Sequence, residues 1–331
     1  MNYISSARKV YNSLHKINFK KLLIGSTRDF DELHQKLQKA FELDALRNSY
    51  IDVISKTISQ FIPFFSDDFK KFLKIKEVSY YYHNISSSTL SHLFWIWSHD
   101  IKMSDEKLNQ FIQSFFLGVF GYKMIDYQKD NRNTNPELSF VGFYSIKLAE
   151  YLLEDILGKN ITNPVYLKYA KVYTHVEYQE KKNKGEPTFF SWDEPKKLGL
   201  KAAPTFIVYE SLFRYAGFSE KKIKDLLDGL TFLSAAMQLI DDLADAKDDL
   251  SNGYETLVTE GYYKNFGYPS EITDEKLNKV LDQERLKLIY RTGQELFSKA
   301  REYVEKHDED MLQLLIEIQN LNFSTLFEVN K

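Results

Sequence analysis

The sequence predicts an all-α protein, and three observations carry that prediction. Glycine and proline together make up about 6% of the 331 residues, roughly half of their usual share of about 12%. Apolar residues recur at three- and four-residue spacing over long stretches, whereas the alternation typical of strands is nearly absent. No internal repeat and no Pro/Ser/Gly-rich linker divides the chain. We therefore expect one all-α domain over residues 1–331.

The first half of the chain predicts helices whose ends carry the expected residues. Pro136 suits a first helical turn, Gly158 suits a helix end, and Asn163 and Pro164 suit the cap and first turn of the next helix. In chain order the apolar periodicity covers Phe30–Phe61, Leu90–His99, Lys107–Asp126, Leu138–Leu157 and Val165–Tyr178.

The second half begins with an irregular stretch. Lys184–Leu200 contains Gly185 and two prolines, which predicts a loop with a short helix. Further on, Gly253 suits the end of a helix. The helical periodicity then covers Pro204–Tyr215, Ile223–Leu250 and Leu277–Val304.

Composition excludes several classes of protein. With 44 basic and 47 acidic side chains, the net charge of −3 argues against nucleic acid as a partner. The longest mostly apolar stretch, Gly229–Ile240, is far shorter than the roughly 20 residues of a bilayer span. The first residues lack the pattern of a signal peptide, so we expect a cytoplasmic protein. Without cysteine there is neither a disulfide framework nor a thiolate metal site.

Aromatic residues are abundant, with 25 Phe and 22 Tyr. This surplus would suit a pocket for a large apolar molecule. A coding bias toward Phe, Tyr, Lys and Asn explains it equally well.

Five aspartates follow one another within nine residues at the end of a long apolar helix. At about 100° per residue, Asp245, Asp248 and Asp249 share the face of Asp241, while Asp242 points aside. Like charges on one face repel one another, and acids in the last turns oppose the helix dipole. A hard cation such as Mg²⁺ would remove this conflict, because it prefers carboxylate oxygens. The alternative is a solvated acidic helix end.

A second pair of aspartates repeats this arrangement. Asp126 and Asp130 lie four residues apart at the end of another long apolar helix, so both face the same side. Two such helix ends placed opposite each other would line the mouth of an apolar cavity with carboxylates.

These residues resemble motifs of the class I isoprenoid synthases. Asp241-Asp242-Leu-Ala-Asp245 resembles the second aspartate-rich motif of trans-prenyltransferases, which Gln238 typically precedes. Asp241, Asp245 and Asp249 also fit the three ligand positions of the terpene cyclase motif. Asp126-x-x-x-Asp130 resembles the first motif of head-to-head synthases and of some cyclases, and Lys201 resembles a mid-chain lysine that contacts diphosphate.

The resemblance implies a bundle of roughly ten or more helices around an apolar pocket, three Mg²⁺ ions and a prenyl diphosphate such as farnesyl or geranylgeranyl diphosphate. It implies that four aspartates are catalytic and bind metal: Asp126, Asp130, Asp241 and Asp245. It also implies that Asp249 binds metal. Lys201 and Arg291 become candidates for binding the diphosphate, and the protein a candidate homodimer. Residues that share a face with the motifs are candidates for the pocket lining, or else pack in the core: Phe115, Val119, Tyr122, Ser234, Met237 and Gln238.

Departures from the family pattern favour one reaction. Elongating prenyltransferases carry adjacent aspartates followed by two arginines, whereas Ile125 precedes Asp126 and only Arg132 follows. We therefore expect a terpene cyclase. A chain-elongating or head-to-head prenyltransferase is the alternative, and a helical scaffold without activity is another. Residues 1–89 match no specific part of the family.

Overall fold

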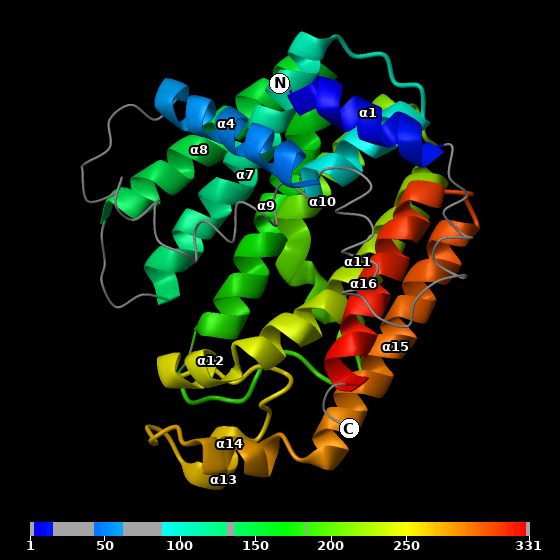
Figure 1. Ribbon diagram of the computed structural model, residues 1–331. Coiled ribbons are helices and arrows are strands. Elements are labelled where there is room, and N and C mark those ends of the chain that lie inside the picture. The colour runs from blue at the N-terminus through cyan, green and yellow to red at the C-terminus, as the bar shows by residue number, and fades with distance from the viewer. Residues whose placement is uncertain (1–2, 16–42, 62–87, 131–135, 183, 329–331) are drawn as a thin grey trace. The chain divides into compact units, whose positions relative to one another are not determined.

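The computed structural model describes residues 3–15, 43–61, 88–130, 136–182 and 184–328. These residues form more than ten helices and no strand, which confirms the all-α prediction (Figure 1). The contacts group them into two compact units, of which each is described by itself. The first comprises Met1–Pro164 with Arg214–Ala216, and the second comprises Val165–Phe213 with Gly217–Lys331. The expected single domain stays a prediction.

The first unit is centred on a pair of long helices that lie side by side, α7 and α8 (Figure 1). Its described helices are α1 (Tyr3–His15), α4 (Leu43–Phe61), a helix over residues 88–98, α7 (Asp105–Asp130) and α8 (Pro136–Leu157). The Ser114 hydroxyl of α7 donates a hydrogen bond of 2.7 Å to the Ala149 carbonyl of α8. This bond satisfies a buried hydroxyl and fixes the register of the two helices.

Two glycines allow α7 and α8 to approach closely. A Cβ atom on Gly121 would lie 2.7 Å from the Gly142 carbonyl oxygen, and one on Gly142 would lie 2.9 Å from the Gly121 oxygen. Both distances are too short for a carbon atom, so side chains at these positions would force the helices apart. The C-terminal turns of α7, which carry Asp126, are therefore set by backbone packing.

The second unit contains the remaining helices, of which α11 packs on α15 and on η1. They are α9 (Lys159–Lys181, beginning in the first unit), η1 (Pro195–Ala202, a 3₁₀ helix), α10 (Ala203–Tyr215), α11 (Glu220–Ala244), α12 (Ala246–Asn252), α13 (Tyr262–Phe266), α14 (Asp274–Val280), α15 (Gln283–Glu305) and α16 (Asp310–Glu328). Buried Gly199 lets η1 lie against the backbone of α11, since a Cβ there would meet the Thr231 oxygen at 2.1 Å. This contact places Lys201, two residues later, beside α11.

Several predicted boundaries are confirmed. Helix α8 begins at Pro136, and Gly158 follows its last residue with φ +93°. Gly253 caps α12 in the left-handed conformation, which glycine adopts without strain. Gly185 has φ +77° within the predicted loop, and η1 is the short helix at its end.

Other boundaries differ from the prediction. Helix α9 begins at Lys159, so Pro164 lies inside it and Asn163 is not its N-cap. The periodicity of Ile223–Leu250 is divided at Asp245 (φ −96°, ψ 6°), and that of Leu277–Val304 is divided before Asp282, whose carboxylate caps α15. Helices α1, α13 and α16 were not predicted. Part of the predicted helix Phe30–Phe61, residues 30–42, lies outside the described residues.

None of the described helices combines the length and the low charge that a bilayer span requires.

Candidate functional site

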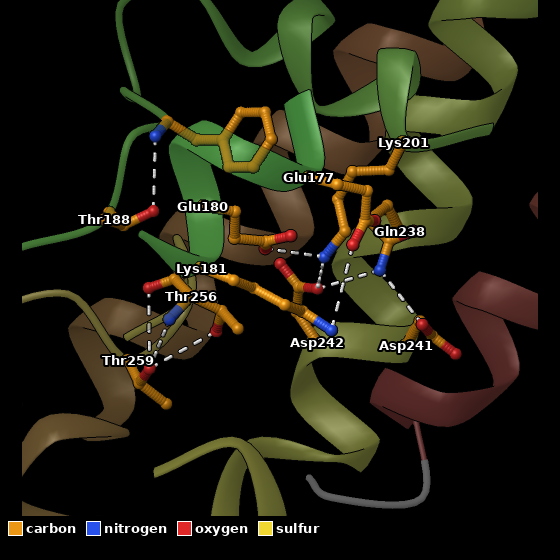
Figure 2. A network of polar contacts seen from close by, with 11 residues as sticks. Glu177, Glu180, Lys181, Thr188, Lys201, Gln238, Asp241, Asp242, Thr256 and Thr259 are labelled. Carbon is orange, nitrogen blue, oxygen red and sulfur yellow. Dashed lines mark hydrogen bonds and ion pairs between the residues drawn. The ribbon is translucent and has the colours of Figure 1, made fainter. Parts of the chain in front are cut away.

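The polar centre of the second unit is the side chain of Lys201. Its Nζ donates to Glu180 Oε1 at 2.8 Å and to Asp242 Oδ1 at 3.3 Å, so that one ammonium group lies between two carboxylates (Figure 2). Glu180 comes from the last turn of α9, Lys201 from η1 and Asp242 from α11. The side chains are 5%, 17% and 2% exposed, respectively. Three elements thus place opposite charges together where little water reaches them.

Gln238 joins this buried group to the surface. Its Nε2 donates to Asp242 Oδ1 and to Asp241 Oδ2, both at 2.9 Å (Figure 2). Asp242 is buried whereas Asp241 is exposed. The amide therefore holds one inward and one outward carboxylate of the motif in a fixed relation.

Burial and crowding of carboxylates shift the pKa values at this site. Burial raises the pKa of Asp242 above its usual range, although Lys201 and Gln238 oppose the shift. Burial, together with Asp242, Glu180 and Asp245, raises the pKa of Asp249 to about 7 against the effect of Lys201. For Lys201 itself, burial lowers the pKa, but Asp242 and Glu180 outweigh it and hold the pKa well above its usual range. Lys201 is therefore charged, and the site carries more negative than positive charge.

The other aspartates of the motif face outward, as the helical spacing predicts. Asp241, Asp245 and Asp248 are exposed, while Asp249 is half-buried. Asp245 is the residue at which α11 gives way to α12, yet its N–H still donates to the Asp241 carbonyl at 2.9 Å. The face predicted for a continuous helix is therefore largely kept across the junction. Asp242 does point aside from this face, toward Lys201.

The carboxylates of the site fit a divalent cation that is also coordinated by water or substrate. The atoms that could coordinate a cation are carboxylate oxygens, which hard cations prefer. Asp242 Oδ2 and Glu180 Oε2 are buried and make no hydrogen bond to any residue that the structure describes. Among the described residues, no three acidic or histidine side chains gather closely enough to hold a metal by themselves. Exposed Asp241 and Asp245 offer carboxylates of the kind that Mg²⁺ takes, one or two at a time, beside water and substrate phosphates.

The first predicted motif lies at the C-terminal end of α7, in the first unit. Asp126 is half-buried, and the side chain of Asp130 lies outside the described residues, as does Arg132. Ile125 packs against α8: a Cβ on Gly142 would lie 2.8 Å from its Cγ1. The position before Asp126 therefore faces a close contact between helices, where an apolar side chain is required.

The residues predicted to line a pocket lie partly in the core. Phe115 is buried, and its ring packs 4.7 Å from that of His92, so the structure gives it a packing role. Tyr122 is half-buried, and burial, with a contribution from Glu150, raises its pKa to about 12. Val119 is half-buried in the first unit, and Ser234, Met237 and Gln238 are half-buried in the second. The expected apolar pocket stays a prediction.

Arg291, the second residue predicted to bind diphosphate, is exposed on α15 and has no described contact with Lys201 or the aspartates. A hollow of about 380 Å³ lies elsewhere in the second unit, around the first turn of α15. It is lined by Trp192, Glu260, Asn265, Lys279, Val280, Asp282, Glu284, Arg285 and Leu288. None of the predicted site residues lines this hollow.

Glu180 is the site residue that the sequence analysis missed, because the predicted helix ended at Tyr178. The signal lies in the helical period: Tyr169, Tyr173 and Val176 are buried on one side of α9, and Glu180 continues that series. A charged residue on an otherwise apolar helix face is rarely buried without a partner. This one is buried because Lys201 pairs with it.

Comparison with known proteins identifies the fold. No protein-family model matches the chain, and no curated protein matches it by sequence. Solved structures do match. The polyprenyl synthase from Caulobacter crescentus CB15, solved with calcium and isoprenyl diphosphate, gives a TM-score of 0.62 at 14% identity, covering 85% of this chain and 96% of its own. The decaprenyl diphosphate synthase from Rhodobacter capsulatus gives 0.61 at 16% identity, covering 87% and 97%.

The chain has the isoprenoid synthase fold. The expectation of a helical bundle with this fold is confirmed, with more than ten helices among the described residues. The neighbours are synthases of prenyl diphosphates, not cyclases, so the comparison supports the alternative of the sequence analysis better than its main expectation.

Proposed function

We propose that the protein is a magnesium-dependent enzyme that uses a prenyl diphosphate, and that its reaction is prenyl transfer. The observation that carries this proposal is the end of α11, where exposed Asp241 is linked through Gln238 and buried Asp242 to the charged Lys201. This arrangement supports a site at which carboxylates would hold a metal and a lysine would face an anion. The similarity to two prenyl diphosphate synthases supports the same conclusion.

Each residue has a proposed role. Asp241, Asp245 and Asp249 are proposed metal ligands of the second unit, and Asp126 and Asp130 are proposed metal ligands of the first. The ions, three in number in this proposal, supply positive charge against the diphosphate oxygens. Gln238 keeps the carboxylate of Asp241 in place through its bond of 2.9 Å. Lys201 contributes a charge that is fixed by Glu180 and Asp242.

A second candidate reaction is cyclisation of a single prenyl diphosphate. Ile125 favours it, because the first motif lacks the adjacent aspartates of elongating synthases and Ile125 packs against Gly142 instead. The substrate class and the metal are the same for both reactions. Arg291, exposed on α15, stays a candidate contact of the diphosphate in both reactions. A homodimer stays a prediction, which light scattering of the purified protein would test.

The reaction is tested with geranyl, farnesyl and geranylgeranyl diphosphates, each with and without isopentenyl diphosphate, in Mg²⁺ and in EDTA. Mass spectrometry of the products distinguishes the candidates. A longer diphosphate that requires isopentenyl diphosphate supports elongation, a joined product from two allylic diphosphates supports head-to-head transfer, and a hydrocarbon or alcohol from one diphosphate alone supports cyclisation. If none of the diphosphates gives a Mg²⁺-dependent product, the result favours a helical scaffold without activity.

Matched variants connect the activity to the site. Asp241→Asn and Asp245→Asn should each reduce turnover by about 100-fold or more, because metal charge is lost where the leaving group departs. Asp248→Asn makes the same change at another exposed aspartate of this helix end and should retain turnover. Equal losses in all three variants would contradict the assigned ligands.

A further inference from the structure

The ammonium group of Lys201 already has two carboxylate partners in the protein, before any anion binds. An ammonium group has three N–H donors. In Lys201, two of them serve carboxylates, Glu180 Oε1 at 2.8 Å and Asp242 Oδ1 at 3.3 Å. The shorter bond is the one to Glu180, which belongs to no recognised motif. An incoming anion therefore meets a lysine whose charge is already compensated.

The balance of charge at this point is negative. Glu180 and Asp242 set two carboxyl groups against the single ammonium group of Lys201, and their side chains are only 5% and 2% exposed. Buried charges are screened much less than exposed ones. A bare diphosphate approaching Lys201 would therefore be repelled by the surplus carboxylate.

Within the described part of the chain, both carboxylates also retain an oxygen that has no hydrogen bond, Glu180 Oε2 and Asp242 Oδ2. A buried acceptor without a partner is costly. The cost is lower while the ammonium stays close, so these oxygens favour keeping Lys201 where it is. Figure 2 shows the amine held between the two carboxylate groups.

We infer that Glu180 makes the binding of diphosphate depend on a divalent cation, by compensating the charge of Lys201 until metal-bound substrate arrives. The inference rests on the proposed function. With Glu180 in place, the positive charge that an anion requires has to come from metal at the exposed aspartates. Without it, Lys201 and Asp242 form a neutral pair, and the lysine is available to an anion that carries no metal.

The test is the affinity for inorganic diphosphate, measured by calorimetry in Mg²⁺ and in EDTA, which needs no substrate turnover. The wild-type protein should bind diphosphate in Mg²⁺ and at least about tenfold more weakly in EDTA. Glu180→Gln, which keeps the shape and removes the charge, should bind about tenfold more tightly in EDTA than the wild type. Its gain in Mg²⁺ should be much smaller.

Two further variants show whether the tighter binding of diphosphate in EDTA comes from Lys201. Adding Lys201→Met to Glu180→Gln should abolish it, because the freed ammonium is its source. Glu177→Gln removes an acid one turn earlier on α9 that pairs with Lys181, and it should behave as the wild type. Circular dichroism and thermal melting show whether each variant is folded. Should Glu180→Gln not fold, Glu180→Asp, whose shorter side chain weakens the contact with Lys201, is measured in its place and should show a smaller gain of the same sign.

The outcomes separate the two proposals. Wild-type protein that binds no diphosphate in Mg²⁺ overturns the proposed function and this inference together. Binding in Mg²⁺ without a gain for the folded Glu180 variant in EDTA overturns the inference alone. A gain that persists without Lys201 also overturns it, since the effect would then be one of general charge.

Discussion

At the scale of single residues, the side chain before Asp126 is one of the two departures from the pattern of elongating synthases that the sequence analysis named. Ile125 does not simply replace an aspartate at a solvent-exposed position. Its Cγ1 lies against Gly142, where a Cβ would come within 2.8 Å of it, so α7 and α8 are close together at this point. The departure in the motif and the tight packing of these helices are therefore one feature, and restoring the aspartate should be costly.

Ile125→Asp should lower the free energy of unfolding by about 2–4 kcal/mol, because it places a charge in an apolar contact with no partner for it. Urea denaturation followed by circular dichroism measures the loss. Ile125→Val removes only one methylene group and should cost about 0.5–1.5 kcal/mol. An aspartate tolerated as well as valine would show that the side chain turns out of the contact.

His92 gives the first unit a dependence of stability on pH. Its Nδ1 donates to the Ser88 carbonyl at 2.6 Å, its ring packs against Phe111 and Phe115, and burial lowers its pKa to about 4. In the unfolded chain the pKa is near 6.5, so between pH 6.5 and 4 only the unfolded chain takes up this proton. Stability should therefore fall by up to about 3 kcal/mol as the pH decreases through this range.

Urea denaturation at pH 7 and at pH 4.5, with the wild type and with His92→Phe, checks this expectation. The variant fills the aromatic site with a group that does not titrate, so its stability should change less between the two pH values. His175→Gln, at an exposed histidine, should follow the wild type. The same pH dependence in His92→Phe would assign the titration to another group.

At the scale of helices, the contact between α7 and α8 offers two glycines with opposite expectations. A Cβ on Gly121 would lie 2.7 Å from both the Gly142 oxygen and Ile146 Cγ1, whereas one on Gly118 would meet Ala149 Cβ at an ordinary 3.5 Å. Gly121→Ala should therefore destabilise the protein by about 1–3 kcal/mol. Gly118→Ala should be neutral or stabilise it by up to about 1 kcal/mol, because alanine favours the helix.

Thermal unfolding of the two variants on the same helix tests this difference. Each adds one methyl group and replaces the same residue, so helix propensity is matched and only the space differs. Equal effects of the two substitutions would mean that the helices can separate at Gly121 without loss.

For the helices, apolar periodicity in the sequence predicted where most of them lie but missed where two of them break. Apolar periodicity located α7, α8, α10 and α11, because each buries one face against a neighbour. The breaks at Asp245 and before Asp282 escaped it, since the apolar period continues on both sides of each break. Helix α9 began earlier than Pro164 predicted, because proline is tolerated near a helix start when few hydrogen bonds are lost.

At the scale of the whole molecule, the fold class and the aspartate motif were predictable, but the pairing of charged side chains at the site was not. Five aspartates on one helix end gave the candidate metal site, since local spacing sets which side chains share a face. Glu180 and Lys201 lie 21 residues apart in sequence. Their pairing depends on how η1 packs on α11 through Gly199, which no local pattern expresses. The choice of reaction depends on the site, whereas the two solved neighbours, at 14% and 16% identity, show the fold.

The whole molecule should also respond to its ligand. A ligand that binds only the folded protein adds about 2.7 kcal/mol of stability at 100 times its dissociation constant. Inorganic diphosphate with Mg²⁺ should accordingly raise the midpoint of thermal unfolding by a few degrees. Either Mg²⁺ alone or diphosphate in EDTA should produce a smaller shift, because the proposed site binds the two together.

Substitutions then show which residues produce the shift. Asp241→Asn should remove it, whereas Asp248→Asn, the same change at another exposed aspartate of that helix end, should keep it. Asp126→Asn tests the first motif by the same measurement. Because Asp241 is exposed and repels its acidic neighbours, Asp241→Asn without ligand should be as stable as the wild type or more stable. A variant that loses both the shift and its intrinsic stability would instead indicate that Asp241 supports the fold, and the assignment of a metal ligand at this position would have to be withdrawn.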